Sequence, residues 1–175
     1  YTPFLTDFIG VVLLVMAAVL MSVLFRRIFG EKIPVAGYVA FACVFLSNPI
    51  ISEVYVYYLH NGIGIGYVLT ALALLLFEEM QKVSPKKKWR FMAGSAVVLT
   101  VAVGCYESFM IVYIMGVLLV LCSLRIAGRE KKGVFLPLCG AAAVTVVSVL
   151  LRSLIVSGCI AIFGLESLSD QAVRR

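Results

Sequence analysis

The sequence has very few residues of the kinds that bind metal ions. It contains one histidine, and its five cysteines include no pair at CxxC spacing. A zinc site takes about four closely organised nitrogen and sulfur ligands, so a metal centre has little support. The cysteines lie in or beside apolar segments, which is typical of buried, unreactive thiols. The residues indicate no cofactor, and they leave open whether a divalent metal takes part.

Charged residues are also scarce. Only 14% of the 175 residues are charged, whereas 63% are hydrophobic and the mean hydropathy is +1.10. A soluble domain is about 45–50% apolar, and a water-soluble core of this size could not hide so much apolar surface. The basic residues behind the net charge of +6 sit in short clusters between apolar segments. The sequence therefore predicts an integral membrane protein and argues against a nucleic-acid partner.

Six apolar segments meet or approach the roughly 20 helical residues that cross about 30 Å of hydrocarbon. We expect an all-α, polytopic membrane domain over residues 1–175, with about six transmembrane helices. Their expected ranges are Phe8–Phe25, Val35–Leu46, Gly62–Phe77, Phe91–Gly104, Phe109–Leu124 and Val134–Gly164. In the last range, Pro137 and Arg152 indicate a kink, a tilt or an interfacial extension. Because Tyr1 comes first and no basic leader precedes the first span, we interpret the chain as an internal portion of a longer protein.

The segment between the second and third spans has a different composition. Asn48-Pro49 predicts a helix break, because the residue before a proline is pushed out of the helical region. Residues 49–61 contain a glutamate, three tyrosines and the single histidine, which is typical of the membrane interface. We expect an interfacial helix or a re-entrant segment there. Gly62 and Gly66 follow at the GxxxG spacing that permits close helix contact.

The distribution of basic residues predicts the orientation. Loops 26–32, 78–90 and 125–133 hold three, five and four of the 15 lysines and arginines, whereas loops 47–61 and 105–108 hold none. By the positive-inside rule, the first three loops are cytoplasmic and the other two are external.

Two glutamates stand at the outer ends of apolar segments, where ionisable groups are costly and often functional. Glu107 occupies the turn between the fourth and fifth spans. Glu53 follows the predicted break, and in a helix it would share a face with Tyr57 and His60. A carboxylate in either place could move a proton or bind sugar hydroxyls. A polar outer loop anchored by tyrosines would explain the same residues without any chemistry.

Two further charged residues are candidates for substrate binding. Arg152 lies deep in the last apolar segment, toward its outer end, where it could pair with Glu107 or Glu53 or bind a lipid phosphate. An arginine near a helix end also snorkels to the headgroups without any such role. Asp7 lies just outside the first span, where it is either a solvated helix-start charge or a weaker candidate.

Three stretches of the chain resemble bacterial Gtr-type membrane glucosyltransferases, the GT-C-like enzymes that add glucose to O-antigen. They are NPIISEVYVYY at Asn48–Tyr58, the glycine-rich start of the third span, and GCYESFMIVYI at Gly104–Ile114. The resemblance covers most of the chain, but Tyr106-Glu107 stands where a Tyr-Gln pair is expected. It implies transfer of a sugar, expected to be glucose, from a polyprenyl-phosphate carrier to a cell-surface glycan. The transfer would take place on the outer face of the bacterial cytoplasmic membrane.

The resemblance also implies site residues and partners. Enzymes of this kind usually hold catalytic acids in outer loops, often the first, which would lie upstream of this chain. Within the chain, the candidate catalytic residues are Glu107 and Glu53. The expected substrate-binding residues are Tyr57, His60, Tyr106, Arg152 and Asp7. The expected partners are membrane lipid, the lipid-linked sugar and the glycan acceptor.

A secondary transporter or a channel component is the main alternative, because acids at the outer rim could also relay ions or protons. Transporters often have broken helices and repeated halves near the bilayer midplane. The chain has a predicted break near Pro49 but no convincing internal repeat, and its charged candidates gather at the outer rim. A purely structural helix bundle would account for the apolar segments alone.

Overall fold

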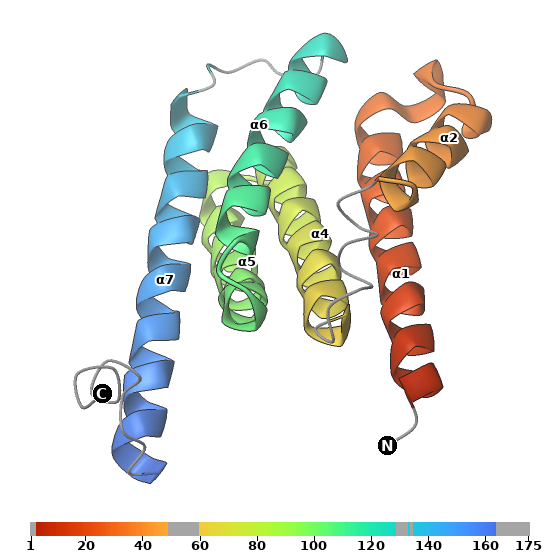
Figure 1. Ribbon diagram of the computed structural model, residues 1–175. Coiled ribbons are helices and arrows are strands. Elements are labelled where there is room, and N and C mark those ends of the chain that lie inside the picture. The colour runs from red at the N-terminus through yellow and green to blue at the C-terminus, as the bar shows by residue number, and fades with distance from the viewer. Residues whose placement is uncertain (1–2, 49–59, 129–132, 134, 164–175) are drawn as a thin grey trace.

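Helices make up almost all of the chain that the computed structural model describes, which is residues 3–48, 60–128, 133 and 135–163 (Figure 1). The elements are α1 (Pro3–Phe29), the 3₁₀ helix η1 (Gly30–Lys32), α2 (Val35–Leu46), α4 (His60–Lys82), α5 (Pro85–Cys105), α6 (Phe109–Ile126) and α7 (Phe135–Phe163). Helices α1, α4, α5, α6 and α7 are long and apolar enough to cross a membrane. The predicted all-α, polytopic architecture is therefore confirmed.

Helix α2 is too short to cross the hydrocarbon layer. It has the bounds that the sequence predicts, and its 12 residues extend over about 18 Å of a layer roughly 30 Å thick. The segment predicted to be interfacial or re-entrant begins just after it, and residues 49–59 lie outside the described part of the chain. The described spans are thus five long helices and one shorter apolar helix.

The long helices extend beyond the apolar segments from which they were predicted. Helix α4 continues past Phe77 to Lys82, and α5 begins at Pro85. Most of the stretch 78–90, expected to be a loop, is therefore helical. Polar side chains do not end a helix by themselves, because water can solvate them at the membrane surface while the helix continues. Pro85 fits the first turn of α5, where an N–H group has no partner within the helix.

Helix α7 is continuous through Pro137. This proline is the third residue of the helix, where its missing N–H removes no intrahelical hydrogen bond. The 29 residues of α7 extend over about 43 Å, which exceeds the thickness of the hydrocarbon layer. Of the alternatives predicted for this segment, a tilt or an interfacial extension accommodates that length.

Helix α4 lies at the centre of the bundle. It packs against α1, α5 and α6, whereas α7 packs mainly on α5 and α2 packs on α1. Figure 1 shows α1 with α2 on one flank and α7 on the opposite flank. The α1–α2, α4–α5 and α6–α7 connections lie at one end of the bundle, which we call the basic end. The α5–α6 turn lies at the other end, which we call the turn end, together with the starts of α1 and α4 (Figure 1).

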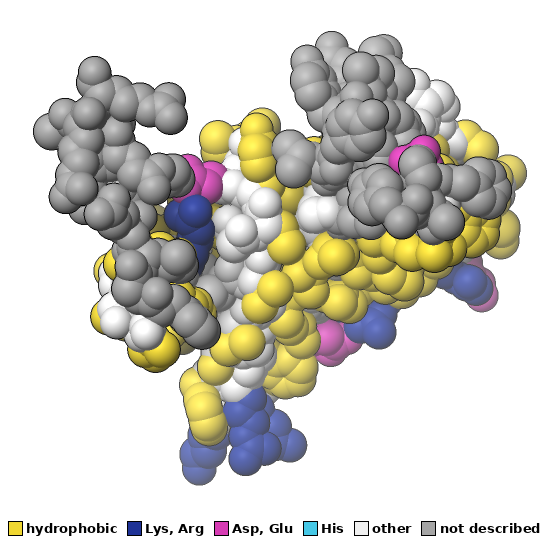
Figure 2. All heavy atoms as spheres, turned by 60° about the horizontal axis from the view of Figure 1, so that its bottom comes forward, with side chains coloured by type: hydrophobic (Ala, Val, Ile, Leu, Met, Phe, Trp, Pro, Cys, Tyr) yellow, Lys and Arg dark blue, Asp and Glu magenta, His cyan; other side chains and the backbone are white. Residues whose placement is uncertain are grey.

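Apolar side chains cover the flanks of the bundle. Figure 2 shows hydrophobic side chains along the helices and a group of lysine and arginine side chains at the end away from the viewer. On α7, Leu150, Leu154 and Ile155 are all more than half exposed. Such a surface is solvated by lipid, and the helices satisfy their own backbone hydrogen bonds, as a membrane requires. The chain is a membrane protein.

Hydroxyl side chains connect the helices inside the bundle. Ser95 Oγ on α5 donates to the Ala73 carbonyl oxygen on α4 at 3.1 Å and lies 3.3 Å from the Tyr113 hydroxyl oxygen on α6. Ser148 Oγ on α7 lies 3.0 Å from the Ala96 carbonyl oxygen on α5. Between membrane helices the hydrophobic driving force is weak, so such hydrogen bonds contribute to association. They hold α6 and α7 against α5, which places the turn end of α6 beside α7.

Two glycines let α4 approach its neighbours closely. A Cβ atom on Gly66 would overlap the Phe109 ring of α6, and one on Gly64 would lie 2.8 Å from Leu13 Cβ on α1. Around Gly62, the described residues place nothing within 4 Å. The predicted close contact is therefore made by one member of the GxxxG pair. Gly64 contacts a different helix from Gly66 because residues two apart do not share a helix face.

We expect Gly66→Ala to lower the free energy of unfolding by about 1–3 kcal/mol, the usual cost of overpacking. The added methyl group overlaps the Phe109 ring, so the ring or α6 must move. Thermal unfolding of the purified protein in detergent measures the effect. Gly62→Ala is the matched control and should keep or slightly raise the midpoint, because alanine is the better helix former. Equal midpoints for the two variants would contradict the prediction.

Candidate functional site

The turn between α5 and α6 has the tight, polar form that the sequence predicts. Helix α5 ends at Cys105, and Tyr106 leaves the helix in an extended conformation with φ −161° and ψ 129°. The Phe109 N–H then donates to the Tyr106 carbonyl oxygen at 3.1 Å, which starts α6. Glu107 and Ser108 therefore form the whole reversal, and their side chains stand at the turn end of the bundle.

An ion pair joins this turn to α7. Nη2 of Arg152 lies 2.7 Å from Oε1 of Glu107, with the side chains 32% and 74% exposed, respectively. The sequence left Glu107 and Glu53 as alternative partners of this arginine, and the structure brings Glu107 to it. Arg152 lies 17 residues into α7, about 26 Å from the helix start. Because its partner Glu107 stands in the α5–α6 turn, the guanidinium lies at the turn end of the bundle.

The ion pair lies at a cavity of about 410 Å³ that we call the charged hollow. Its walls are the last residues of α5, the turn and one residue of α7. The lining residues are Val103, Gly104, Cys105, Tyr106, Glu107, Ser108 and Arg152. Nε of Arg152 is buried, and no described residue accepts a hydrogen bond from it. Glu107 therefore occupies only part of the hydrogen-bonding capacity of this guanidinium, which has five N–H donors.

Aromatic side chains form a series that ends at the charged hollow. The rings of Phe41, Phe45, Tyr67, Phe109 and Tyr106 follow one another at centroid distances of 6.3, 5.8, 5.1 and 6.5 Å. Edge-to-face pairs at such distances contribute about 0.5–1.5 kcal/mol each beyond burial. This aromatic series runs from α2 through α4 and α6 to the α5–α6 turn. It supports Tyr106, which is 52% exposed and lines the hollow.

The charges in the hollow suit an acid–base reaction on an anionic substrate. Glu107 lies two residues before the start of α6, near the end of the helix dipole that favours a negative charge. A carboxylate there can accept a proton from a hydroxyl group. The guanidinium of Arg152 can bind a phosphate through several N–H donors and stabilise charge on a departing phosphate. A substrate phosphate and Glu107 would compete for the same cation, which would free the carboxylate when the phosphate binds.

The remaining predicted site residues are not assembled around the hollow by the described part of the chain. Glu53 and Tyr57 lie outside the described residues. His60 begins α4, and its side chain is also outside them. Asp7 is exposed on α1, on the flank opposite α7 (Figure 1), and is not among the residues that line the hollow. The catalytic role of Glu53 and the substrate-binding roles of Tyr57, His60 and Asp7 stay predictions.

A buried carboxylate at the basic end was missed by the sequence reasoning. Glu78 on α4 is 0% exposed, and its Oε1 lies 2.5 Å from Nζ of Lys82. The neighbouring Glu79 pairs with Arg27 of α1 at 2.5 Å between Oε1 and Nη1. The spacing of four between Glu78 and Lys82 could have indicated an intrahelical pair. It could not have indicated burial, which depends on how the neighbouring helices pack on α4.

No group of three or more His, Cys, Asp or Glu side chains comes together as metal ligands within the described ranges.

Comparison with known proteins gives one match that covers nearly the whole chain. The sequence model of the family described as "Glucosyl transferase GtrII" matches residues 1–174. No curated protein and no solved structure matches the chain.

Proposed function

Because the chain belongs to the glucosyl transferase GtrII family, whose members are membrane glycosyltransferases, we propose that it transfers glucose from a polyprenyl-phosphate carrier. The acceptor in this proposal is a glycan on the outer face of the bacterial cytoplasmic membrane, such as O-antigen. The observation that carries the proposal is the ion pair of Glu107 and Arg152 at the charged hollow. It offers a base for the acceptor and a cation for the phosphate of the donor.

The reaction can be written as a single displacement at the anomeric carbon of the sugar. A hydroxyl oxygen of the acceptor forms a bond to that carbon while the bond from carbon to the phosphate oxygen breaks. Glu107 accepts the hydroxyl proton as the general base. The polyprenyl phosphate leaves with the bonding electrons, and Arg152 stabilises the charge that develops on its phosphate. Tyr106 contributes an exposed aromatic wall at the same cavity.

The positions of the charges support the proposed orientation. Arg27, Lys32 and Lys82 lie at the basic end, and the charged hollow lies at the turn end. The positive-inside rule then places the basic end in the cytoplasm and the hollow on the outer side. A lipid-linked sugar is the donor that suits this side, because its carrier is anchored at the surface of the bilayer. Glu53, Tyr57, His60 and Asp7 are proposed as further substrate-binding or catalytic residues on the outer side.

The position of the ion pair favours interfacial transfer over ion relay. Arg152 pairs with the turn that joins α5 to α6, so the ion pair lies at the turn end of the bundle. A relay in a transporter is expected to place its ionisable groups near the bilayer midplane.

The proposal is tested by sugar transfer in membranes that contain the full-length protein. The donor is polyprenyl-phosphate glucose with a radiolabelled sugar, and the acceptor is the isolated cell-surface glycan. We expect label to appear in the glycan, and we expect none when the same membranes receive labelled UDP-glucose under conditions that block synthesis of the lipid-linked donor. Transfer from UDP-glucose alone would refute the lipid-linked donor. Failure of the folded, inserted protein to use either donor would refute the proposed function.

A further inference from the structure

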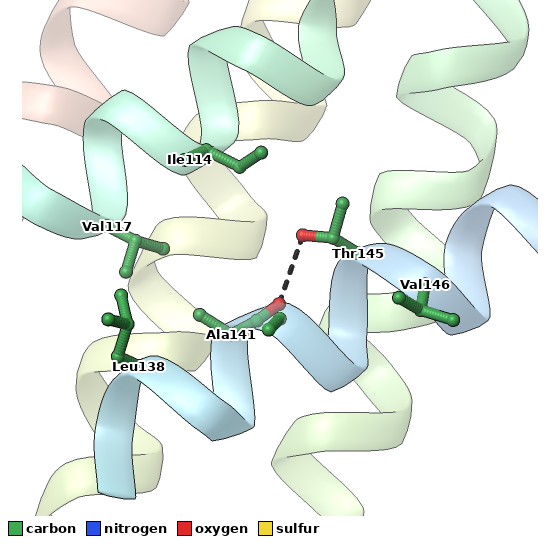
Figure 3. A pocket seen from close by; sticks show the side chains of 7 residues that line it. Ile114, Val117, Leu138, Ala141, Thr145 and Val146 are labelled. Atoms are coloured by element: carbon green, nitrogen blue, oxygen red, sulfur yellow. Dashed lines mark hydrogen bonds between the residues drawn. The ribbon is translucent and has the colours of Figure 1, made fainter. Parts of the chain in front are cut away.

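A second cavity lies between α6 and α7 and is almost entirely apolar (Figure 3). It has a volume of about 240 Å³ and is lined by Ile114, Val117, Leu138, Ala141, Ala142, Thr145 and Val146. Thr145 is the one lining residue with a polar side chain. Its Oγ1 donates to the Ala141 carbonyl oxygen at 3.0 Å, as the dashed line in Figure 3 shows. The hydroxyl is therefore satisfied within α7, and the cavity wall has no free polar group from this side chain.

This apolar cavity lies along the same pair of helices as the charged hollow. On α7, Thr145 precedes Arg152 by seven residues, and two full helical turns place both on one face. On the α6 side of the cavity, Ile114 follows Glu107 by seven residues. Seven residues extend over about 10 Å of a helix. Both helices thus place the apolar cavity about 10 Å from the ion pair, toward the middle of the membrane.

A cationic side chain beside an apolar cavity matches an amphipathic ligand with a phosphate at one end. Binding sites of this kind are mostly apolar, with a few polar groups that fix the orientation of the ligand. Here Arg152 supplies the cation for the phosphate, and its Nε–H donates to no acceptor among the described residues. The apolar cavity would then receive the part of the lipid chain that follows the phosphate.

We infer that the apolar cavity binds isoprene units beyond the first one of the lipid-linked donor while the charged hollow binds its phosphate and sugar. This inference rests on the proposed function. An apolar cavity of 150 Å³ binds benzene, so one of about 240 Å³ holds roughly ten carbon atoms. Ala141 and Ala142 leave width for the methyl branches of an isoprenoid. Val146 is 58% exposed, so the cavity is open to the bilayer there. The remaining isoprene units of the lipid would extend from the cavity into the bilayer.

The test is a kinetic comparison of donors that differ in their lipid chain. One donor carries glucose phosphate on a long polyprenyl chain, and the other carries it on a single isoprene unit, which is too short to reach the cavity. The full-length protein is placed in lipid nanodiscs, and KM and kcat are measured with each donor. Ala142→Phe fills the cavity from an exposed position. Ala143→Phe is the matched control, because Ala143 is also an exposed alanine of α7 but does not line the cavity.

We expect Ala142→Phe to raise KM for the long-chain donor at least tenfold, with kcat and the kinetics of the short donor unchanged. Ala143→Phe should behave as the unaltered protein with both donors. The same KM for both variants, or equal effects on both donors, would overturn the inference while the proposed function stands. Ala142→Leu gives the same test if the phenylalanine variant does not fold. Absence of transfer by the unaltered protein would instead refute the proposed function.

A second measurement separates the isoprenoid from ordinary membrane lipid. Polyprenyl phosphate without sugar should compete with the long-chain donor in the unaltered protein and compete at least tenfold less well in Ala142→Phe. Phosphatidylglycerol, which also has a phosphate and apolar chains, should compete weakly with either protein. Equal competition by the two lipids would mean that the cavity binds phospholipid, and it would overturn the inference.

Discussion

We expect Glu107→Gln to lower kcat for glucosyl transfer by about 10²–10⁴-fold, the contribution that a positioned general base makes. Glutamine keeps the size of the side chain and can still accept a hydrogen bond from Arg152, but it cannot take a proton from the acceptor hydroxyl. The exposure of Glu107 and its place in the turn mean that the change removes little packing. The loss should therefore appear in kcat at saturating donor and acceptor, with expression and unfolding midpoint unchanged.

Glu79→Gln is the matched control for this change. Glu79 is also a glutamate paired with an arginine, Arg27, but it lies at the basic end, far from the charged hollow. Its neutral variant should transfer glucose at the rate of the unaltered protein. If Glu107→Gln kept full kcat, the general base would be another group. Glu53 would then be the next residue to substitute.

The second large effect is expected at the basic end, where Lys82→Met should lower the free energy of unfolding by about 3–5 kcal/mol. That is the typical cost of leaving a buried charge without its partner. Glu78 is 0% exposed, its Oε1 lies 2.5 Å from Nζ of Lys82, and its Oε2 has no hydrogen-bond partner among the described residues. Lys82 is 43% exposed, so water can reach part of the pair and the lower end of the range is expected. Thermal unfolding in detergent measures the loss.

Two further variants identify the cause of this loss. The double variant Lys82→Met/Glu78→Gln also replaces the buried carboxylate by a neutral amide. Most of the lost stability should therefore return. Lys86→Met removes an exposed lysine at the same end of the bundle and should change stability by no more than about 0.5 kcal/mol. A double variant as unstable as Lys82→Met would show that the lysine stabilises the fold through packing and that its charge is unimportant.

The spans, their order and the α5–α6 turn could be predicted because they depend on local composition. Val35–Leu46 is bounded by Pro34 on one side and by polar residues on the other, and the structure has the same bounds. Glu107 could be placed at a helix end because polar residues interrupt two apolar segments there. These inferences need the thickness of a bilayer and the preferences of single residues, without knowledge of which helices are neighbours.

The contacts between helices could not be predicted in the same way. In a membrane helix both the lipid face and the buried face are apolar, so periodicity does not show which side packs. The sequence therefore could not decide whether Arg152 meets Glu107 or Glu53, because the answer depends on α7 packing beside α5 and α6. The same limit hid the burial of Glu78 and the contact of Gly64 with α1. The aromatic series also joins residues from three helices and has no pattern within any one of them.

The shortness of α2 has a consequence for the membrane itself. Its 12 residues are about 12 Å too short to match the hydrocarbon thickness by themselves, and the polar Ser47 and Asn48 follow at the end of α2. A bilayer adapts to a short apolar stretch by becoming thinner around it. In the proposed orientation, the bilayer would be thinned in its outer leaflet, on the side of the bundle where the aromatic series begins. Water and sugar hydroxyl groups could then reach deeper along the bundle there than at places where the outer leaflet has its full thickness.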